Sequence, residues 1–303
     1  MTKLSVIVCT YNRDKYILET LQHLKDQTCE PGLYEVIVID NNSTDQTEQI
    51  CRNFIMQKEI MNFLYFRELN QGNTYSRNRG ILESRGQYIS FIDDDARATE
   101  KYCEHIISFF DRNPGVSVIG GRITPVYEHA EPAWMSRFLW PLVAGLDMGD
   151  KVRPFKGSRY PIGANMAYRA EVFARYGNFK ENLGKRPDVL EGGDEKDLIF
   201  RVRNKGLKIF YVPDVHVFHV IPESRLKINY IRQQAIGVGM SEKRRLQGMP
   251  AGEWMKKVMD ELIKIGGTFV LAFVYFFTFK FLKGMMLIRF RFWVLNGYQK
   301  KVK

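Results

Sequence analysis

The chain has 303 residues, of which 45% are hydrophobic, enough for one large or two modest domains with a full core. This composition excludes collagen-like, low-complexity and small disulfide-scaffold proteins. The formal charge is +11, and residues 241–303 hold 13 basic and 4 acidic side chains, a net charge of +9. Because these basic residues coincide with the most apolar stretch, we expect them to face an anionic membrane surface and no nucleic acid.

The first 120 residues alternate short β-branched runs with longer amphipathic segments, which indicates a parallel sheet flanked by helices. The predicted strands are Leu4–Cys9, Val36–Ile39, Phe63–Phe66, Tyr88–Ile92 and Val116–Ile119. The predicted helices between them begin near Asp14, Ser43, Asn73 and Tyr102. The fold class is therefore α/β, with a doubly wound, mostly parallel sheet.

The second half is less regular. Residues 121–160 contain prolines among aromatic side chains, and we expect a loop or subdomain over one end of the sheet. An acidic segment, Glu191–Asp197, opens a helix that runs to about Asn204. A late strand at Lys208–Val212 and a helix at Ile228–Arg245 follow. The predicted domains are 1–120, 121–247 and a basic, hydrophobic helical tail at 248–303.

The tail contains 15 residues without a charge, 265–279, between Lys264 and Lys280. As a helix they span about 22 Å, short of the roughly 30 Å hydrocarbon core of a bilayer. We therefore expect a helix or helical hairpin that lies in one leaflet, a peripheral or monotopic attachment. The alternative is a buried core helix or a dimer interface.

Two features bear on location. The cysteines form no C-x-x-C pair, which favours free thiols in a reducing compartment. The first residues turn polar at Thr10, too early for the apolar region of a signal peptide. We expect the protein at the cytoplasmic side of the cell membrane.

Polar clusters follow three of the predicted strands: Thr10–Arg13, Asp40–Asp45 and Asp93–Asp95. In an open α/β sheet, ligands bind beyond the carboxyl ends of the strands. Each cluster alone is explained by capping or turn chemistry, but their common location points to a binding site.

The three consecutive aspartates are the sharpest local signal. Carboxylates about 5 Å apart repel by about 3 kcal/mol at an effective dielectric near 20, so two that point together need a cation. Oxygen ligands favour Mg²⁺ or Mn²⁺, which keep positions for substrate phosphates. The alternative is a solvated acidic turn.

Six motifs follow one another between residues 3 and 245: Ser5–Arg13, Asp40–Asp45, Arg77–Gly80, Phe91–Asp95, Gly163–Arg169 and Gly193–Leu198. In this order they resemble the motifs of family 2 glycosyltransferases with the GT-A fold. The resemblance implies an inverting, metal-dependent enzyme that uses a nucleotide sugar. Binding of the donor's nucleoside, taken as uridine, is implied for Thr10, Tyr11, Asn12, Asp40 and Arg77.

The resemblance also assigns the acidic residues. It implies that Asp93 contacts the ribose, that Asp94 is the variable middle residue, and that Asp95 binds Mn²⁺ or Mg²⁺. His219 resembles a histidine beside the diphosphate or the metal, although a lone histidine is more often a core residue.

The general base is assigned to the pair Asp194 and Glu195. Family members usually carry Glu then Asp here, with the second residue as the base, and this chain reverses the order. Glu195 occupies the aligned place, and Asp194 reaches the same point if the backbone shifts. The alternative role for one of the two is structural, since an acidic side chain at a helix N-terminus complements the helix dipole.

The sequence thus predicts a transferase that moves a sugar from a UDP-sugar to a hydroxyl of a lipid-linked or surface-polysaccharide glycan, and it leaves the oligomeric state open. A sugar nucleotidyltransferase is disfavoured because Thr10–Asp14 lacks a glycine-rich, lysine-bearing phosphate loop. A non-catalytic, membrane-anchored nucleotide-sugar binder is the remaining alternative, suggested by the reversed order of Asp194 and Glu195.

Overall fold

The computed structural model describes residues 1–57, 62–157, 159–181, 183, 193–247 and 251–300. These residues form two compact units. The sheet unit holds 1–126, the described part of 144–183, and 193–220, and the helical unit holds 127–143 and 221–300. The predicted domain boundaries at 120 and 247 stay predictions.

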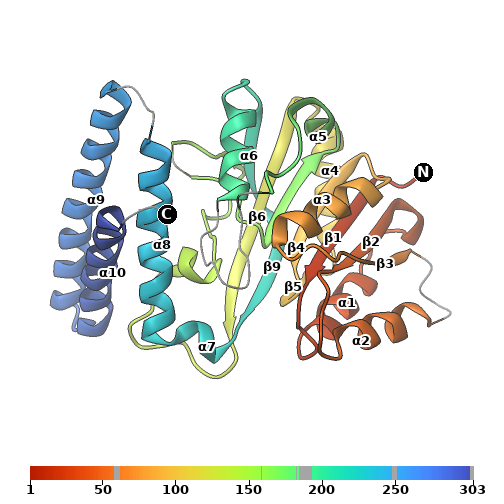
Figure 1. Cartoon of the computed structure of the whole chain (residues 1–303), viewed down its shortest axis with the longest axis horizontal. Coiled ribbons are helices and arrows are strands. Elements are labelled where there is room, and N and C mark those ends of the chain that lie inside the picture. Colours follow the sequence, from red (N-terminus) through yellow and green to blue (C-terminus); the bar gives the residue numbers. More distant parts are fainter. Residues whose placement is uncertain (58–61, 158, 182, 184–192, 248–250, 301–303) are drawn as a thin grey trace. The chain divides into compact units, whose positions relative to one another are not determined.

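The sheet unit contains one mixed sheet in the order β3-β2-β1-β4-β8-β6-β9-β5 (Figure 1), and β7 pairs with β9. Its parallel part is β1 (Leu4–Thr10), β2 (Tyr34–Asp40), β3 (Phe63–Arg67) and β4 (Tyr88–Asp93). The remaining strands are β5 (Ala96–Ala98), β6 (Val116–Tyr127), β7 (Arg153–Pro154), β8 (Asn165–Arg169) and β9 (Lys208–Ile221). β8 pairs antiparallel with both β4 and β6. The predicted α/β fold class is confirmed.

Helices cover both faces of this sheet. They are α1 (Ile17–Lys25), η1 (Pro31–Leu33), α2 (Thr47–Ile55), α3 (Asn73–Glu83), α4 (Tyr102–Arg112), α5 (Glu171–Tyr176) and α6 (Asp194–Arg203). One core contains buried residues of α1, α2 and α4, and the other contains those of α5 and α6 with Ile81 of α3 at its margin. Alternate side chains of β1 enter opposite cores, as a strand buried on both faces requires.

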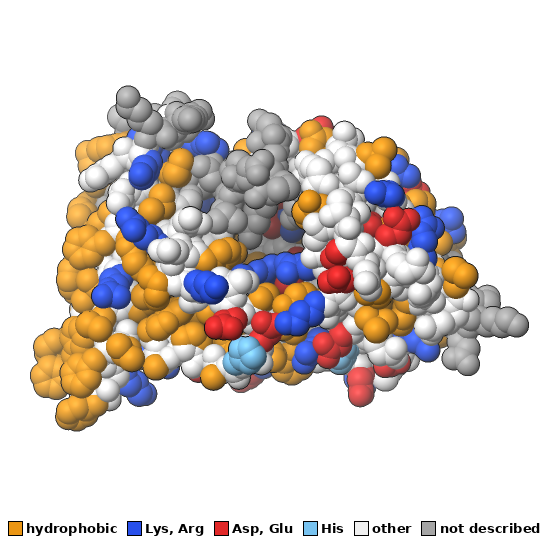
Figure 2. Space-filling view, turned by 60° about the horizontal axis from the view of Figure 1, so that its bottom comes forward, with side chains coloured by type: hydrophobic (Ala, Val, Ile, Leu, Met, Phe, Trp, Pro, Cys, Tyr) orange, Lys and Arg blue, Asp and Glu red, His pale blue; other side chains and the backbone are white. Residues whose placement is uncertain are grey.

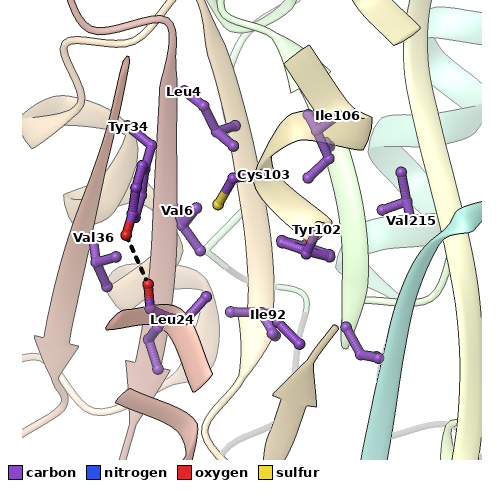
Figure 3. Packing of buried hydrophobic residues seen from close by; sticks show 14 of the residues in the cluster. Leu4, Val6, Leu24, Tyr34, Val36, Ile92, Tyr102, Cys103, Ile106 and Val215 are labelled. Atoms are coloured by element: carbon purple, nitrogen blue, oxygen red, sulfur yellow. Dashed lines mark hydrogen bonds between the residues drawn. The ribbon is translucent and has the colours of Figure 1, made fainter. Parts of the chain in front are cut away.

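The first core is made of closely packed, mostly apolar side chains (Figure 3). Leu4 and Val6 of β1 and Val36 of β2 pack there with side chains of the covering helices. The polar tips of its tyrosines are paired: the Tyr34 hydroxyl donates a hydrogen bond of 3.0 Å to the Leu24 carbonyl, and the Tyr102 hydroxyl lies 2.6 Å from Ser90 Oγ. Burying the rings therefore leaves their hydroxyls satisfied, and the strand ends stand on a rigid base.

The predicted strands extend by one to three residues in the structure, and two of them, β6 and β9, run far past their predicted ends. The predicted end of β6 at Ile119 is wrong, because Gly120 and Gly121 continue the strand where side chains do not fit. A Cβ at Gly121 would overlap the Val215 carbonyl and the Asn165 amide. The predicted end of β9 at Val212 is also wrong, although the buried alternation of Val215, Val217 and His219 is typical of a strand.

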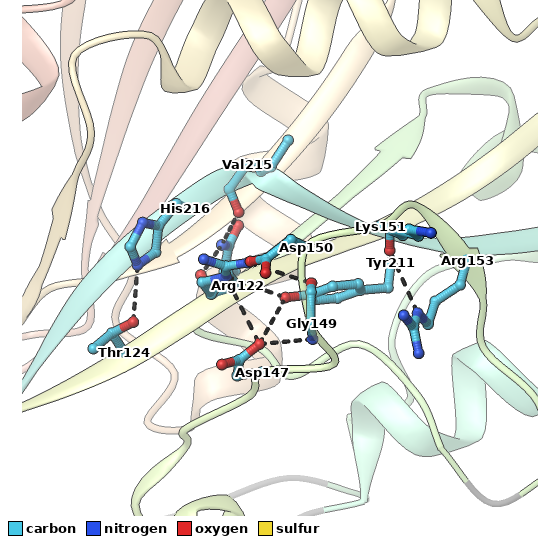
Figure 4. Close-up of polar contacts among 11 residues, drawn as sticks. Arg122, Thr124, Asp147, Gly149, Asp150, Lys151, Arg153, Tyr211, Val215 and His216 are labelled. Carbon is cyan, nitrogen blue, oxygen red and sulfur yellow. Dashed lines mark hydrogen bonds and ion pairs between the residues drawn. The ribbon is translucent and has the colours of Figure 1, made fainter.

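Polar side chains fix the irregular segment that follows β6 (Figure 4). Arg122 of β6 donates to the Asp150 carboxylate at 2.5 Å and to the Gly149 carbonyl at 3.3 Å. Beside it, Thr124 and His216 Nε2 lie 2.9 Å apart. The stretch predicted as irregular, 121–160, is therefore partly strand and partly tied to β6 and β9.

The helical unit contains η2 (Trp140–Val143), α7 (Glu223–Leu226), α8 (Ile228–Leu246), α9 (Ala251–Phe277) and α10 (Phe281–Gln299). α10 packs against both α8 and α9. Gly239 and Gly297 permit the α8 contact, since a Cβ at Gly239 would lie 2.9 Å from the Gly297 Cα. The predicted helical tail is confirmed. Within the described ranges, no helix combines enough length and apolar character to cross a membrane.

Candidate active site

The carboxyl ends of the parallel strands bring three predicted site residues to one edge of the sheet. In the strand register Thr10 stands opposite Asp40, and Cys9 stands opposite Asp93. Because parallel neighbours end at the same edge, these polar side chains are adjacent without any special loop. We call this edge the rim.

The loop after β1 is held against the loop after β2. Asn12 has a φ of 52°, a left-handed conformation that asparagine tolerates. Its backbone N–H donates to Ser43 Oγ at 3.0 Å, and its side-chain oxygen accepts from the Thr44 N–H at 2.8 Å. Tyr11, just before it, is exposed. The loop is therefore fixed while its tyrosine faces solvent.

Asp40 has a scaffolding role in this structure. It is fully buried, and it accepts hydrogen bonds of 2.8 Å from both the Ser43 N–H and the Tyr65 hydroxyl. Its contact with a nucleoside stays a prediction, as do those of Thr10, Tyr11 and Asn12.

Arg77 of α3 joins the two candidate bases. Its Nη1 lies 2.5 Å from Asp194 Oδ2 and 3.0 Å from Glu195 Oε1, and we call these three residues the Arg77 cluster. The Asp194 side chain is 2% exposed, whereas the Glu195 side chain is 21% exposed. Of the two acids, Glu195 is the one that a substrate in solvent can reach.

Burial and the neighbouring charges set the proton affinities of the Arg77 cluster. Burial raises the pKa of Asp194, Glu195 adds to the shift, and Arg77 opposes it. Burial disfavours the charged guanidinium, but Glu195 and Asp194 outweigh it and raise the pKa of Arg77. Arg77 therefore stays charged, and Asp194 holds a proton at higher pH than an ordinary aspartate.

Gly163, just before β8, makes room for the Arg77 cluster. A Cβ at this position would overlap Arg77 Nη2 and Glu195 Oε1. The glycine is therefore required by close packing against the two charged groups. The sequence showed the glycine but not what it faces.

A second cluster combines Asp93, Asp95 and His219, whose ligand atoms all lie within 4.8 Å of one another. The fully buried His219 Nε2 lies 2.8 Å from Asp95 Oδ1 and 3.7 Å from Asp93 Oδ2. The pairing of β9 with β5 sets this geometry, since Ala96, next to Asp95, is opposite His219. We call these three residues the Asp-Asp-His cluster.

The donor set of the Asp-Asp-His cluster fits a divalent ion. Carboxylate oxygens are typical ligands of Mg²⁺ and Mn²⁺, and an imidazole nitrogen extends the choice toward softer divalent metals. Three convergent donors leave coordination positions for water or phosphate oxygens.

The sequence placed Arg13 in the polar cluster after the first strand but gave it no role of its own. Its Nε lies 3.3 Å from Asp94 Oδ1, and its Nη2 lies 3.4 Å from Asp95 Oδ2. Asp94 is buried, and burial raises its pKa against the opposing effect of Arg13. A basic residue that follows a strand on an acidic rim was the available signal.

The two clusters lie at the same end of the sheet. The pKa of Arg77 is raised by Asp93 as well as by its two direct partners. Burial raises the pKa of the Cys9 thiol to about 12, and that thiol also senses Arg77, Asp93 and Asp194. The carboxyl end of β1 therefore lies close to both clusters, and the predicted base and metal residues meet at one rim.

The Glycosyl transferase family 2 model matches residues 5–177, more than half of the chain. The chain belongs to this family. It is a glycosyltransferase, as are its named relatives. Glucosyl-dolichyl phosphate glucuronosyltransferase of Haloferax volcanii is 26% identical over 245 residues, which cover 80% of this chain and 76% of the relative. Glycosyltransferase AglE of the same organism is 27% identical, with 70% and 64% covered.

Solved structures agree with the family 2 fold. The Pyrobaculum calidifontis mannosyltransferase PcManGT, in complex with GDP-Man and Mn²⁺, aligns with a TM-score of 0.66 at 17% identity and covers 99% of this chain and 88% of its own. Staphylococcus aureus TarS 1–349 with UDP-GlcNAc aligns with a TM-score of 0.55 at 20% identity, covering 78% and 66%. At these identities the alignments show the GT-A fold alone.

Proposed function

We propose that this glycosyltransferase is metal-dependent and inverting, and that it moves a sugar from a UDP-sugar to a hydroxyl of a lipid-linked or surface-polysaccharide glycan. The observation that carries the proposal is the partly exposed Glu195, held by Arg77 near the Asp-Asp-His cluster on one rim. A single displacement needs the base and the diphosphate site on one rim.

Glu195 is the proposed general base. An acceptor hydroxyl, with a pKa near 15 or so, must lose its proton as its oxygen attacks the anomeric carbon, and one positioned carboxylate accepts it. The bond to the nucleoside diphosphate breaks on the opposite face, which inverts the anomeric centre. Arg77 holds Glu195 in place, and Asp194 in turn holds Arg77.

Asp95 and His219, the predicted metal residues, would hold the Mn²⁺ or Mg²⁺ together with Asp93, for which this proposal replaces the predicted ribose contact. The ion, when bound, neutralises charge that develops on the leaving diphosphate. Mn²⁺ and nucleotide sugars in the structural neighbours support this assignment, although their donors include both GDP-Man and UDP-GlcNAc. The dolichyl phosphate in the name of one relative supports a lipid-linked acceptor.

The donor is tested by measuring the thermal stability of the full chain with UDP- and GDP-sugars, with and without Mn²⁺. We expect a UDP-sugar to raise the melting temperature only with the metal, and Asp95→Ala to remove that rise and all sugar transfer. Asp95→Ala with unchanged transfer would refute the site. Stabilisation by GDP-sugars alone would refute the uridine assignment.

The proposed location is an anionic membrane surface at the cytoplasmic side. α9 and α10 expose large apolar side chains, among them Phe273, Phe277 and Phe281, and Figure 2 shows hydrophobic side chains gathered over the C-terminal helices. Lysines and arginines along the same segment complement acidic headgroups.

The membrane proposal is tested with vesicles of phosphatidylglycerol and phosphatidylcholine. We expect the full chain to co-sediment, and Phe273→Glu/Phe277→Glu to stay in the supernatant, since both side chains are more than half exposed and tolerate a charge. Leu82→Glu, at an exposed position of α3, is the matched control and should still bind. If the full chain forms dimers and does not co-sediment with vesicles, the apolar surface of the tail is better explained as a dimer interface.

A further inference from the structure

Arg13 occupies the side of Asp95 that His219 does not. His219 contacts Asp95 Oδ1 at 2.8 Å, and the guanidinium of Arg13 lies 3.4 Å from Asp95 Oδ2. The Asp95 side chain is only 1% exposed, so its two carboxylate oxygens face protein groups, His219 and Arg13 among them. A divalent ion that binds Asp95 therefore meets the positive charge of Arg13 at close range.

Three further contacts keep Arg13 at this position. Its Nε lies 3.3 Å from Asp94 Oδ1, and its backbone N–H donates to Thr47 Oγ1 at 2.8 Å. The guanidinium also stands over the Tyr16 ring, 5.6 Å from its centroid. Residues of the loop after β1, of α2 and of the aspartate run therefore all contact Arg13. These contacts fix its position, unlike that of a solvated surface arginine.

We propose that Arg13 is the resident counter-ion of the Asp-Asp-His cluster, which holds Asp95 in the metal-free protein and lowers the affinity of the cluster for divalent metal. The inference rests on the proposed metal site and assigns a residue that regulates it. Asp94, outside the cluster, has the role of holding Arg13. Since like charges repel more strongly near a protein interior than in water, removal of this one charge has a large effect on metal affinity.

The test measures Mn²⁺ binding to the full chain without donor, from the electron paramagnetic resonance signal of free Mn²⁺ at fixed pH and salt. Arg13→Gln should tighten Mn²⁺ binding by about tenfold. Arg13→Met, which keeps an unbranched chain over Tyr16, should tighten it by a similar factor. Arg13→Lys keeps the charge and should stay within about threefold of the native protein.

The outcomes separate the inference from the function on which it rests. If the native chain binds no Mn²⁺, the metal site and the inference both fall. If it binds Mn²⁺ but Arg13→Gln and Arg13→Met bind equally or more weakly, with native melting temperatures in EDTA, the inference alone is overturned. Arg13→Lys binding as tightly as Arg13→Gln would also overturn it, because shape and not charge would then set the affinity.

Discussion

The two acidic clusters of the rim each face an arginine, and they differ in how deeply that arginine lies. The Arg77 side chain is 4% exposed and contacts Asp194 and Glu195 at 2.5 and 3.0 Å. The Arg13 side chain is 23% exposed, and its contacts with Asp94 and Asp95 are 3.3 and 3.4 Å long. The first arrangement is suited to a fixed base, and the second to a cation that yields to a metal ion.

The difference follows from the elements that carry each arginine. Arg77 lies within α3, which is anchored against the sheet, and its partners lie on the first turn of α6. Arg13 lies in a loop, and its partners follow the end of β4. Removing either partner of the deeply buried Arg77 pair leaves an uncompensated buried charge, whereas Arg13 is 23% exposed and keeps part of its own solvation.

The largest effect should come from removing Arg77. Arg77→Met leaves two carboxylates beside an apolar chain, so we expect the free energy of unfolding to fall by about 3–5 kcal/mol and transfer to be lost. Denaturation in urea measures the first effect, and product formation measures the second.

The double variant Arg77→Met/Asp194→Asn is the control for this prediction. It removes the buried carboxylate as well as its partner, and it should recover part of the lost stability but none of the transfer. If Arg77→Met is as stable as the native chain, the Arg77 cluster is held no more tightly than the contacts of Arg13 with Asp94 and Asp95.

Replacing Glu195 should affect catalysis more than stability. In Glu195→Gln the proton acceptor is absent, and kcat should fall by about 10²–10⁴-fold while donor binding persists. Asp194→Asn should instead change the free energy of unfolding more than kcat, since this carboxylate is buried against Arg77. Kinetics and urea denaturation of both variants check the division, and a larger kcat loss in Asp194→Asn would reverse the base assignment.

The sequence predicted the strands whose signal is local. β1, β2 and β4 are short, mostly apolar runs, and each ends at a polar cluster, so the rim itself was predictable. The far end of β9 was missed because Pro213 interrupts it, although Val215, Val217 and His219 alternate beyond the proline. Glu191 and Gly192, where the predicted acidic segment begins, lie outside the described residues.

Contacts between side chains that lie far apart in the sequence could not be predicted in this way. Arg13 and Asp94 are 81 positions apart, and Gly163 faces Arg77 across 86 positions. No periodicity records such a contact, because it depends on strand order and on the depth at which each chain segment crosses the sheet. The order of the motifs therefore indicated the family. The separate roles of Asp194 and Glu195 could be assigned only from how deeply each side chain is buried in the structure.

A smaller effect is expected from adding one methyl group at Gly163. The Cβ of Gly163→Ala would overlap Arg77 Nη2 and Glu195 Oε1, so both groups must shift. A displacement of this size at a base should lower kcat by about 10–100-fold, with donor affinity nearly unchanged. Gly115→Ala, which meets only the flexible end of Lys208 at 3.9 Å, is the matched control and should keep native kinetics.

The last prediction concerns the dependence of stability on pH. Because burial and Glu195 raise the pKa of Asp194, the folded protein binds a proton there more tightly than the unfolded chain, whose aspartates titrate near 4. This group therefore makes the free energy of unfolding fall as pH rises from about 4 toward neutrality, by at most about 1.4 kcal/mol per pH unit. In Asp194→Asn this contribution is absent, so the variant should gain stability relative to the native chain over the same range. If urea denaturation at several pH values shows the opposite trend, the attraction of Arg77 for the Asp194 carboxylate outweighs the effect of burial on its pKa. The Arg77 cluster would then be stabilised mainly by its charges.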